Sequence, residues 1–242
     1  MMRWIPLVAV WLLPASPGAN DKEAETRFLR MADRVKTAKT VQIVCKGSFK
    51  TAGFEAGVTA TLLLKEGNKM RLDLDTTGVR GADPYTYRLR MISNGARLRM
   101  RENKEAWSEF STTPHWNEIV LDNITRGGFP TGLELTRVKK EGDREDAGIG
   151  FRPVAEPADF ALWSKERVDG KDAVPIEFKG RNESEFTKEA TTILWLAESS
   201  GLPAKRMVVI RTDRSLTVTE NYPKFALDEA LEDSSFSFPA DD

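Results

Sequence analysis

Cysteine and histidine are almost absent from this sequence of 242 residues, which contains one of each. A single cysteine cannot form an internal disulfide bond, so the stability of the chain must come from its packed core. One cysteine and one histidine also cannot supply the three or four ligands of a zinc site. Cys45 lies in an apolar, strand-like stretch and is better explained as a small buried side chain than as a reactive thiol.

Recognisable catalytic motifs are missing as well. A Ser-His-Asp or Cys-His arrangement would have to use His115, but no Gly-x-Ser-x-Gly motif occurs, and His115 is better explained as a surface residue. Acidic residues are numerous, so a hydrolase with paired carboxylates stays open as an alternative. Asp73 and Asp75, however, share a strand face with Arg71, which favours a solvated charge ladder. We therefore expect no catalytic role, no metal and no cofactor.

Neither sign of charge is in excess, because 36 Lys and Arg residues stand against 37 Asp and Glu residues. Nucleic-acid-binding domains are typically strongly basic, so this balance argues against a nucleic-acid partner. A glycine-rich phosphate loop is also missing, since Gly127 and Gly128 follow a predicted helix and do not open one.

Long apolar runs are limited to the N-terminus, "MMRWIPLVAVWLLPASPGAN". Arg3 precedes an apolar run over residues 4–13, and small residues and prolines follow through Ala19, which is typical of a secretory signal peptide. The run is too short to span a bilayer, which takes about 20 residues. We expect a signal peptide over residues 1–19 and a single exported domain over residues 20–242, with an uncleaved anchor as the alternative.

The remaining chain has one helical stretch and then strand periodicity. Phe28, Met31 and Val35 lie on one stripe of a helix predicted within residues 20–40. Apolar residues then alternate in two hairpins, with turns at residues 66–68 and at Asn94-Gly95, a pair suited to a type I′ turn. A second amphipathic helix is predicted over residues 114–126, after which strands resume. Residues 224–231 could add one short helical turn.

This order of elements favours a mainly β (α+β) fold. About nine to eleven short strands would form one curved antiparallel sheet with helices on one face. A two-sheet sandwich is the alternative.

The stretch "ILWLAESSGLPAKRMVVI", residues 193–210, has apolar residues on both faces of a predicted strand pair. One face should line the concave side of the sheet and the other should meet a covering element. We assign Trp195 and Met207 to the concave side.

Five arginines lie on the polar face of the hairpin around Asn94: Arg88, Arg90, Arg97, Arg99 and Arg101. They could contact the phosphates of a lipid head group or a polyanion. Cross-strand pairing with Asp73, Asp75 and Glu102 is the interpretation that we favour.

Four stretches together resemble the outer-membrane lipoprotein carrier (LolA/LolB-like) superfamily, which also includes related exported lipid-binding proteins and periplasmic regulator domains. They are "RFLRMADRVKTAKTVQIVCKGSF", "LLLKEGNKMRLDL", "MISNGARLRM", and "ILWLAESSGLPAKRMVVI" with the final "FSFPADD". The resemblance implies an open, unclosed β-barrel with an N-terminal helix and a helical lid that includes residues 114–126. Two features depart from the best-known carriers. Glu66-Gly67 stands where an Arg-Pro pair often latches the lid, and Arg97, Leu98 and Arg99 replace an aromatic residue.

Face alternation and the resemblance together predict a periplasmic, monomeric protein that holds acyl chains of lipids or lipoproteins in an apolar cavity and contacts the membrane transiently. A sensor or interaction module of the same fold, with an envelope protein as its partner, is the alternative. The predicted ligand contacts are Leu62, Leu64, Met70, Leu72, Leu74, Leu89, Met91, Leu98, Met100, Trp116, Ile119, Val120, Ile124, Trp195 and Met207.

Overall fold

The computed structural model describes residues 21–51, 53–111, 116–126, 135–138, 148–151, 156–181, 190–211 and 215–239. The predicted signal peptide, His115 and the Gly127-Gly128 helix stop lie outside these residues.

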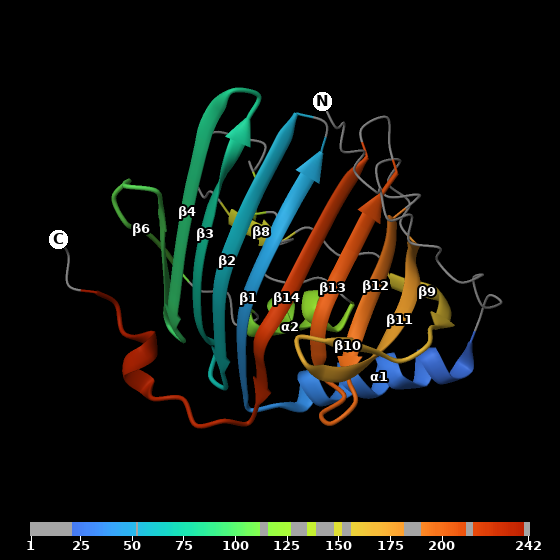
Figure 1. Ribbon diagram of the computed structural model, residues 1–242. Helices are drawn as coiled ribbons and strands as arrows, with labels where there is room; N and C mark the ends of the chain where they lie inside the picture. Colours follow the sequence, from blue (N-terminus) through green and yellow to red (C-terminus); the bar gives the residue numbers. More distant parts are fainter. Residues whose placement is uncertain are drawn as a thin grey trace, which may run out of the picture.

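The fold is dominated by one antiparallel sheet of twelve strands (Figure 1). Its order is β10-β11-β12-β13-β14-β1-β2-β3-β4-β5-β6, and β9 also pairs with β11. The strands are β1 (Thr40–Thr51), β2 (Phe54–Lys65), β3 (Lys69–Arg80), β4 (Asp83–Asn94), β5 (Arg97–Glu102), β6 (Ser108–Ser111), β9 (Glu156–Leu162), β10 (Glu166–Val168), β11 (Lys171–Arg181), β12 (Ala190–Ala197), β13 (Pro203–Ile210) and β14 (Leu216–Leu227). A separate pair, β7 (Leu135–Val138) and β8 (Gly148–Phe151), forms a second small sheet.

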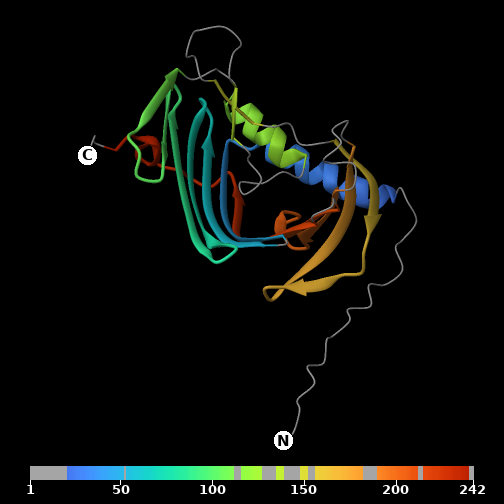
Figure 2. The same cartoon turned by 90° about the horizontal axis from the view of Figure 1, so that it is seen from above.

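The large sheet is curved and unclosed. Seen from above, its strands bend into a trough, and β6 lies far from β9 and β10 at the other end of the sheet (Figure 2). The contact between β14 and β1 joins the two halves of the chain into this one sheet. The prediction of a mainly β fold with one curved antiparallel sheet is confirmed, and the two-sheet sandwich is wrong.

Two helices lie on the concave side of the trough (Figure 2). Helix α1 (Lys22–Thr37) is capped by Asp21, whose carboxylate accepts hydrogen bonds from the backbone N–H groups of Glu23 and Ala24 at 2.8 and 3.2 Å. Its buried stripe includes Phe28, whose ring lies 5.0 Å from that of Phe178 in β11. Helix α2 (Trp116–Thr125) lies beside α1. Both predicted helices are present and use their apolar faces to cover the sheet.

Apolar and polar side chains alternate along the strands, so that one face of the sheet is buried and the other faces solvent. In β3, Met70, Leu72 and Leu74 are buried, while Arg71 and Asp73 between them are only partly covered. Twelve-residue strands that keep this alternation can bury one face over their whole length because successive side chains point to opposite sides. The apolar core therefore lies between the concave face of the sheet and the two helices.

The turns agree with the predicted hairpins, although one turn type does not. Gly67 and Asn68 have positive φ angles of 81° and 60° between β2 and β3. Between β4 and β5 only Gly95 has a positive φ, of 97°, whereas a type I′ turn requires positive φ at both central residues. The side chain of Asn94 instead accepts hydrogen bonds from the backbone N–H groups of Ala96 and Arg97, both at 3.0 Å. The hairpin at this position is confirmed and the type I′ turn is wrong.

The C-terminal segment crosses from β14 to the outer side of β3 and β4 and ends in a short helix, η2 (Asp233–Phe236). Asp233 forms ion pairs with Lys65 at 2.7 Å and Lys69 at 3.0 Å, and Phe236 is buried. The prediction of a helical turn over residues 224–231 is wrong. Pairing between Phe225 and Ile43 extends the β14 ladder through Leu227, and ladder hydrogen bonds exclude a helix there.

Candidate ligand-binding face

The concave face brings most of the predicted contact residues together. One buried cluster contains Leu62, Leu64, Met70, Leu72, Leu74, Leu89, Met91, Leu98 and Met100 from the sheet, and Val120 and Ile124 from α2. Ile119 packs against this cluster and is partly buried. Trp116 begins α2, but its side chain is outside the described part of the structure. The structure thus places these residues on one apolar surface, and their contact with a ligand stays a prediction.

Trp195 and Met207 do not belong to this surface. Leu194 and Leu196 join the main cluster, whereas Trp195 and Met207 lie in a second cluster with Val168. The assignment of Trp195 and Met207 to the concave side is therefore wrong. The register decides the matter, because Leu194 pairs with the buried Ile176 of β11 and so turns Trp195 to the opposite face.

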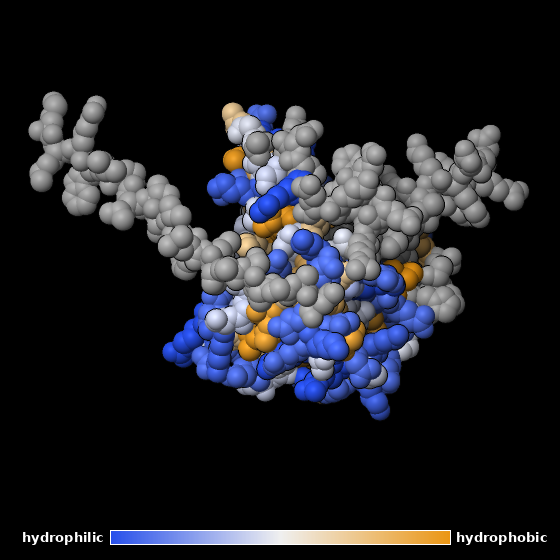
Figure 3. All heavy atoms as spheres, turned by 90° about the vertical axis from the view of Figure 1, so that its right-hand side faces the viewer, coloured by the Kyte–Doolittle hydropathy of each residue, from blue (hydrophilic) through white to orange (hydrophobic). Residues whose placement is uncertain are grey.

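Polar side chains of neighbouring strands contact the second cluster. The indole N–H of Trp195 donates a hydrogen bond to the carboxylate of Glu166, and the ammonium group of Lys205 lies 4.5 Å from the centre of the Trp195 ring. On the described surface on the right-hand side of Figure 1, hydrophilic residues dominate and hydrophobic patches are small (Figure 3). The two apolar faces of residues 193–210 thus have different partners, the main core on one side and a small outer cluster on the other.

A buried polar cluster interrupts the apolar interior at β13 and β14. The guanidinium Nε of Arg206 lies 2.6 Å from Oε2 of Glu220, and the hydroxyl of Tyr222 donates a hydrogen bond to the same oxygen at 2.5 Å. Burial, and secondly the nearby Glu220 carboxylate, raise the pKa of the Tyr222 hydroxyl. The same two causes raise the pKa of the Cys45 thiol, so Cys45 is a neutral core side chain, as expected.

Glycine at position 47 makes room for this cluster. Gly47 pairs with Glu220 across β1 and β14, and a Cβ atom at position 47 would lie 2.7 Å from the carbonyl oxygen of Thr219 and 3.2 Å from Cγ of Glu220. Sequence reasoning missed the cluster because Arg206 and Glu220 look like ordinary wet-face charges. A usable signal was present in "LTVTENYP", where Glu220 shares its face with Val218 and Tyr222.

Helix α2 is attached to the turn between β2 and β3. The backbone N–H of Asn117 donates to Oδ1 of Asn68 at 3.0 Å, and the Asn117 side-chain amide donates to the carbonyl oxygen of Lys65 at 2.6 Å. A hollow of about 490 Å³ next to this contact has Val41, Leu64 and Leu121 among its lining residues. The turn that lacks the Arg-Pro pair thus holds the helix through asparagine hydrogen bonds.

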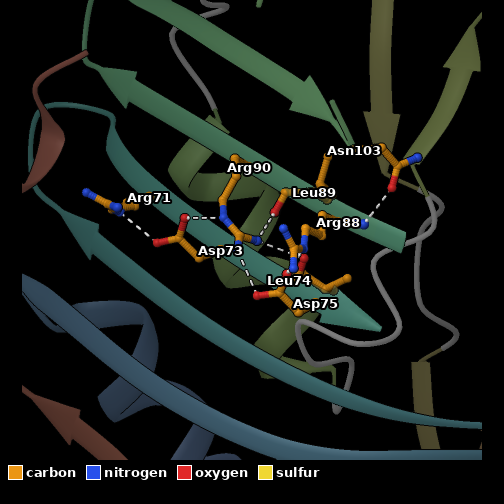
Figure 4. A network of polar contacts seen from close by, with 8 residues as sticks. All are labelled: Arg71, Asp73, Leu74, Asp75, Arg88, Leu89, Arg90 and Asn103. Carbon is orange, nitrogen blue, oxygen red and sulfur yellow. Dashed lines mark hydrogen bonds and ion pairs between the residues drawn. The ribbon is translucent and has the colours of Figure 1, made fainter. Parts of the chain in front are cut away.

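Most arginines on the outer face of the sheet form ion pairs with carboxylates. Figure 4 shows these pairs on β3 and β4. Arg90 lies 3.1 Å from Asp73 and 2.7 Å from Asp75, and Arg71 and Arg88 contact the same two carboxylates. The predicted cross-strand pairing with Asp73 and Asp75 is confirmed.

Further along the same face, Arg97 and Arg99 both bind Glu109, at 3.0 and 2.9 Å. These two hydrogen bonds lower the pKa of the Glu109 carboxyl. Sequence reasoning did not foresee Glu109 as their partner.

The described part of the chain holds no group of three or more His, Cys, Asp and Glu residues able to bind a metal ion. Its helices include none that is long and apolar enough to cross a membrane.

Comparison with known proteins gave similarities in structure only. No family model matches the sequence, and no curated protein matches it. LprF from Mycobacterium bovis is similar at 10% identity and a TM-score of 0.48, over 88% of this chain and 99% of LprF. MucB is similar at 13% identity and a TM-score of 0.43, over 92% of this chain and 65% of MucB. The LolA superfamily protein NE2245 from Nitrosomonas europaea is similar at 14% identity and a TM-score of 0.31, over 89% of this chain and 97% of NE2245.

Proposed function

We propose that this protein binds the acyl chains of lipids or lipoproteins on its concave face, without a catalytic step. The observation that carries the proposal is the apolar surface of β1–β5, whose side chains form one buried cluster with residues of α1 and α2. A helix can be displaced from such a surface without breaking the ladder of the sheet. The surface would then accept a flexible apolar ligand in place of the helix.

Methionine side chains make this interior adaptable. Met31 of α1 and Met70, Met91 and Met100 of three successive strands all belong to the main cluster. Methionine is unbranched and has three rotatable bonds, so it can fill spaces of different shape at low cost. An interior with four such residues can repack around acyl chains that differ in length.

Binding of an acyl chain on this surface requires α2 to move away from the sheet. Each buried methylene contributes about 0.8 kcal/mol, so a long acyl chain gains a large favourable term from burial alone. Leu62, Leu72 and Met91 are already fully buried, so a ligand must replace existing contacts of Val120 and Ile124. The helix and the ligand therefore compete for one surface.

We propose that the protein is exported and binds its ligand outside the inner membrane. The support is the signal-peptide pattern of residues 1–19, whose cleavage would leave a periplasmic protein. An interaction module of the same fold is the alternative function. Arg97 and Arg99, its candidate surface, are both bound to Glu109, so the charge that they offer to a partner is smaller than expected.

Uptake of a fluorescent fatty-acid probe by the purified protein tests the proposal. Leu74→Asp puts a charge on the apolar face of the sheet, where the acyl chain would bind, and should lower probe uptake at least tenfold. Leu29→Asp on the exposed side of α1 is the control and should leave uptake unchanged. Mass spectrometry of the native protein should find co-purified lipid in the wild type. Equal uptake by the wild type and Leu74→Asp would refute binding on the concave face.

A further inference from the structure

Arg101 differs from the other arginines on the outer face of the sheet. Within the described residues, Arg101 forms no ion pair, and its buried Nε has no hydrogen-bond acceptor. Its direct neighbour across β4 and β5 is Arg90, which is committed to Asp73 and Asp75. Asp73, Asp75 and Glu109 are therefore paired with the other arginines, and Arg101 has no ion-pair partner among the described residues.

Trp107 covers one side of the Arg101 guanidinium group. The centre of that group lies 4.8 Å from the centre of the indole ring. The turn after β5 supports this arrangement, because Asn103 donates its backbone N–H to the carbonyl oxygen of Arg88 at 2.7 Å and accepts the Arg88 N–H at 3.0 Å through its side chain. A ring over the guanidinium face leaves the in-plane N–H groups as the donors that can bind an oxygen anion.

A hollow of about 580 Å³ lies at this position. It is lined by Arg99, Arg101, Lys104, Glu105, Ala106, Trp107 and Glu109, and we call it the Arg101 pocket. The charge of Glu109 is balanced by Arg97 and Arg99, which leaves Arg101 and Lys104 against Glu105. The net positive charge of the pocket is reinforced by the surrounding face, where five paired arginines share only three carboxylates.

We infer that the Arg101 pocket binds a phosphate group, either of a phospholipid head group or of a free phosphate ester. Guanidinium N–H groups match two phosphate oxygens at once, and a lysine adds a mobile point charge. Because strand alternation puts Leu98 and Met100 inside and Arg101 outside, this pocket is on the opposite face from the apolar surface. The inference goes beyond acyl-chain binding and does not depend on it.

The test compares three variants of the full chain with the wild type. Arg101→Gln should weaken phosphate-dependent binding about tenfold or more, since a hydrogen bond to a charged group contributes about 1.5–3 kcal/mol. Arg101→Lys should keep part of the affinity. Arg88→Gln is the matched control, because Arg88 lies on the same face but outside the pocket and is paired with Asp75.

Two probes distinguish the sources of phosphate. Glycerol 3-phosphate is titrated and followed by NMR, and vesicles of phosphatidylglycerol or phosphatidylcholine are used in sedimentation. Binding of glycerol 3-phosphate supports a free phosphate ester, and binding of phosphatidylglycerol vesicles alone supports a head group. Binding of neither probe, or an equal loss in Arg88→Gln and Arg101→Gln, overturns the inference. Uptake of the acyl probe by Arg101→Gln should equal that of the wild type, which separates this result from the test of the concave face.

Discussion

Arg206 and Glu220 form a buried ion pair of 2.6 Å, with side-chain exposures of 6% and 0%. The two residues stand directly opposite each other on β13 and β14. Removing both charges from water is costly, and the pair recovers that cost only while both partners are present.

Breaking this pair should therefore destabilise the protein strongly. Arg206→Met leaves the Glu220 carboxylate buried without its counter-ion, and we expect a loss of about 3–5 kcal/mol in the free energy of unfolding. The double variant Arg206→Met/Glu220→Leu should recover most of this loss. Urea unfolding measures all three proteins. Arg27→Ala, which removes the exposed Arg27–Glu23 pair of α1, is the control and should cost less than about 1 kcal/mol. A double variant no more stable than Arg206→Met would contradict this account.

Stability should also fall in alkaline solution. The folded-state pKa values of Tyr222 and Cys45 are raised above their ordinary values of 10.0 and 9.0, so folding favours the neutral forms. Their contribution is fully present below pH 9.0 and is lost progressively at higher pH, as the unfolded chain releases protons that the folded chain keeps. Urea midpoints at about pH 8 and about pH 10.5 should show the loss. The double variant Tyr222→Phe/Cys45→Ala should lose less stability over the same interval, and an unchanged pH dependence would argue against this cause.

Asn117 should control how readily α2 leaves the sheet. Asn117→Ala removes the hydrogen bond to the Lys65 carbonyl and should weaken the attachment by about 1–3 kcal/mol. If the helix competes with the ligand, acyl-probe association should become several-fold faster, as stopped-flow fluorescence can measure. Asn103→Ala, which loses a comparable hydrogen bond at the outer turn, should not change the association rate. Equal rates for both variants would show that the α2 attachment does not limit entry.

The C-terminal segment should detach in acid. Lys65 and Lys69 hold the pKa of Asp233 at about 2, below its ordinary value of 3.8. The attachment is therefore complete above pH 3.8 and is lost as the pH falls through about 2. Hydrogen exchange of residues 229–237 should accelerate over this interval before the core strands exchange faster. Asp233→Asn should show fast exchange of this segment already at neutral pH. Slow exchange in that variant would mean that burial of Phe236 and the hydrogen bonds to the Glu229 and Leu231 carbonyls hold the segment without Asp233.

Much of the fold followed from local pattern. The helical spacing of Phe28, Met31 and Val35 predicted α1, and alternation around Leu62, Leu72 and Leu98 predicted both the strands and the residues that share a buried face. These inferences succeeded because the distance between neighbouring side chains along one helix or strand is set by local geometry. The type I′ turn at Asn94-Gly95 was wrong, because Asn94 caps the turn with its side chain and keeps a negative φ.

The sequence by itself determined the period of each segment, and therefore which side chains go together. Only the tertiary structure decided which group faces the core. Residues 193–210 have two apolar faces of similar size, and the pairing of Leu194 with Ile176 selects one of them and sends Trp195 outward. Tertiary structure likewise placed the charges of Arg206 and Glu220 inside, and left Arg101 on the outer face without a carboxylate partner among the residues that the structure describes. The physical reason is that burial and ion pairing depend on strands far apart in the chain, whose register no local pattern specifies.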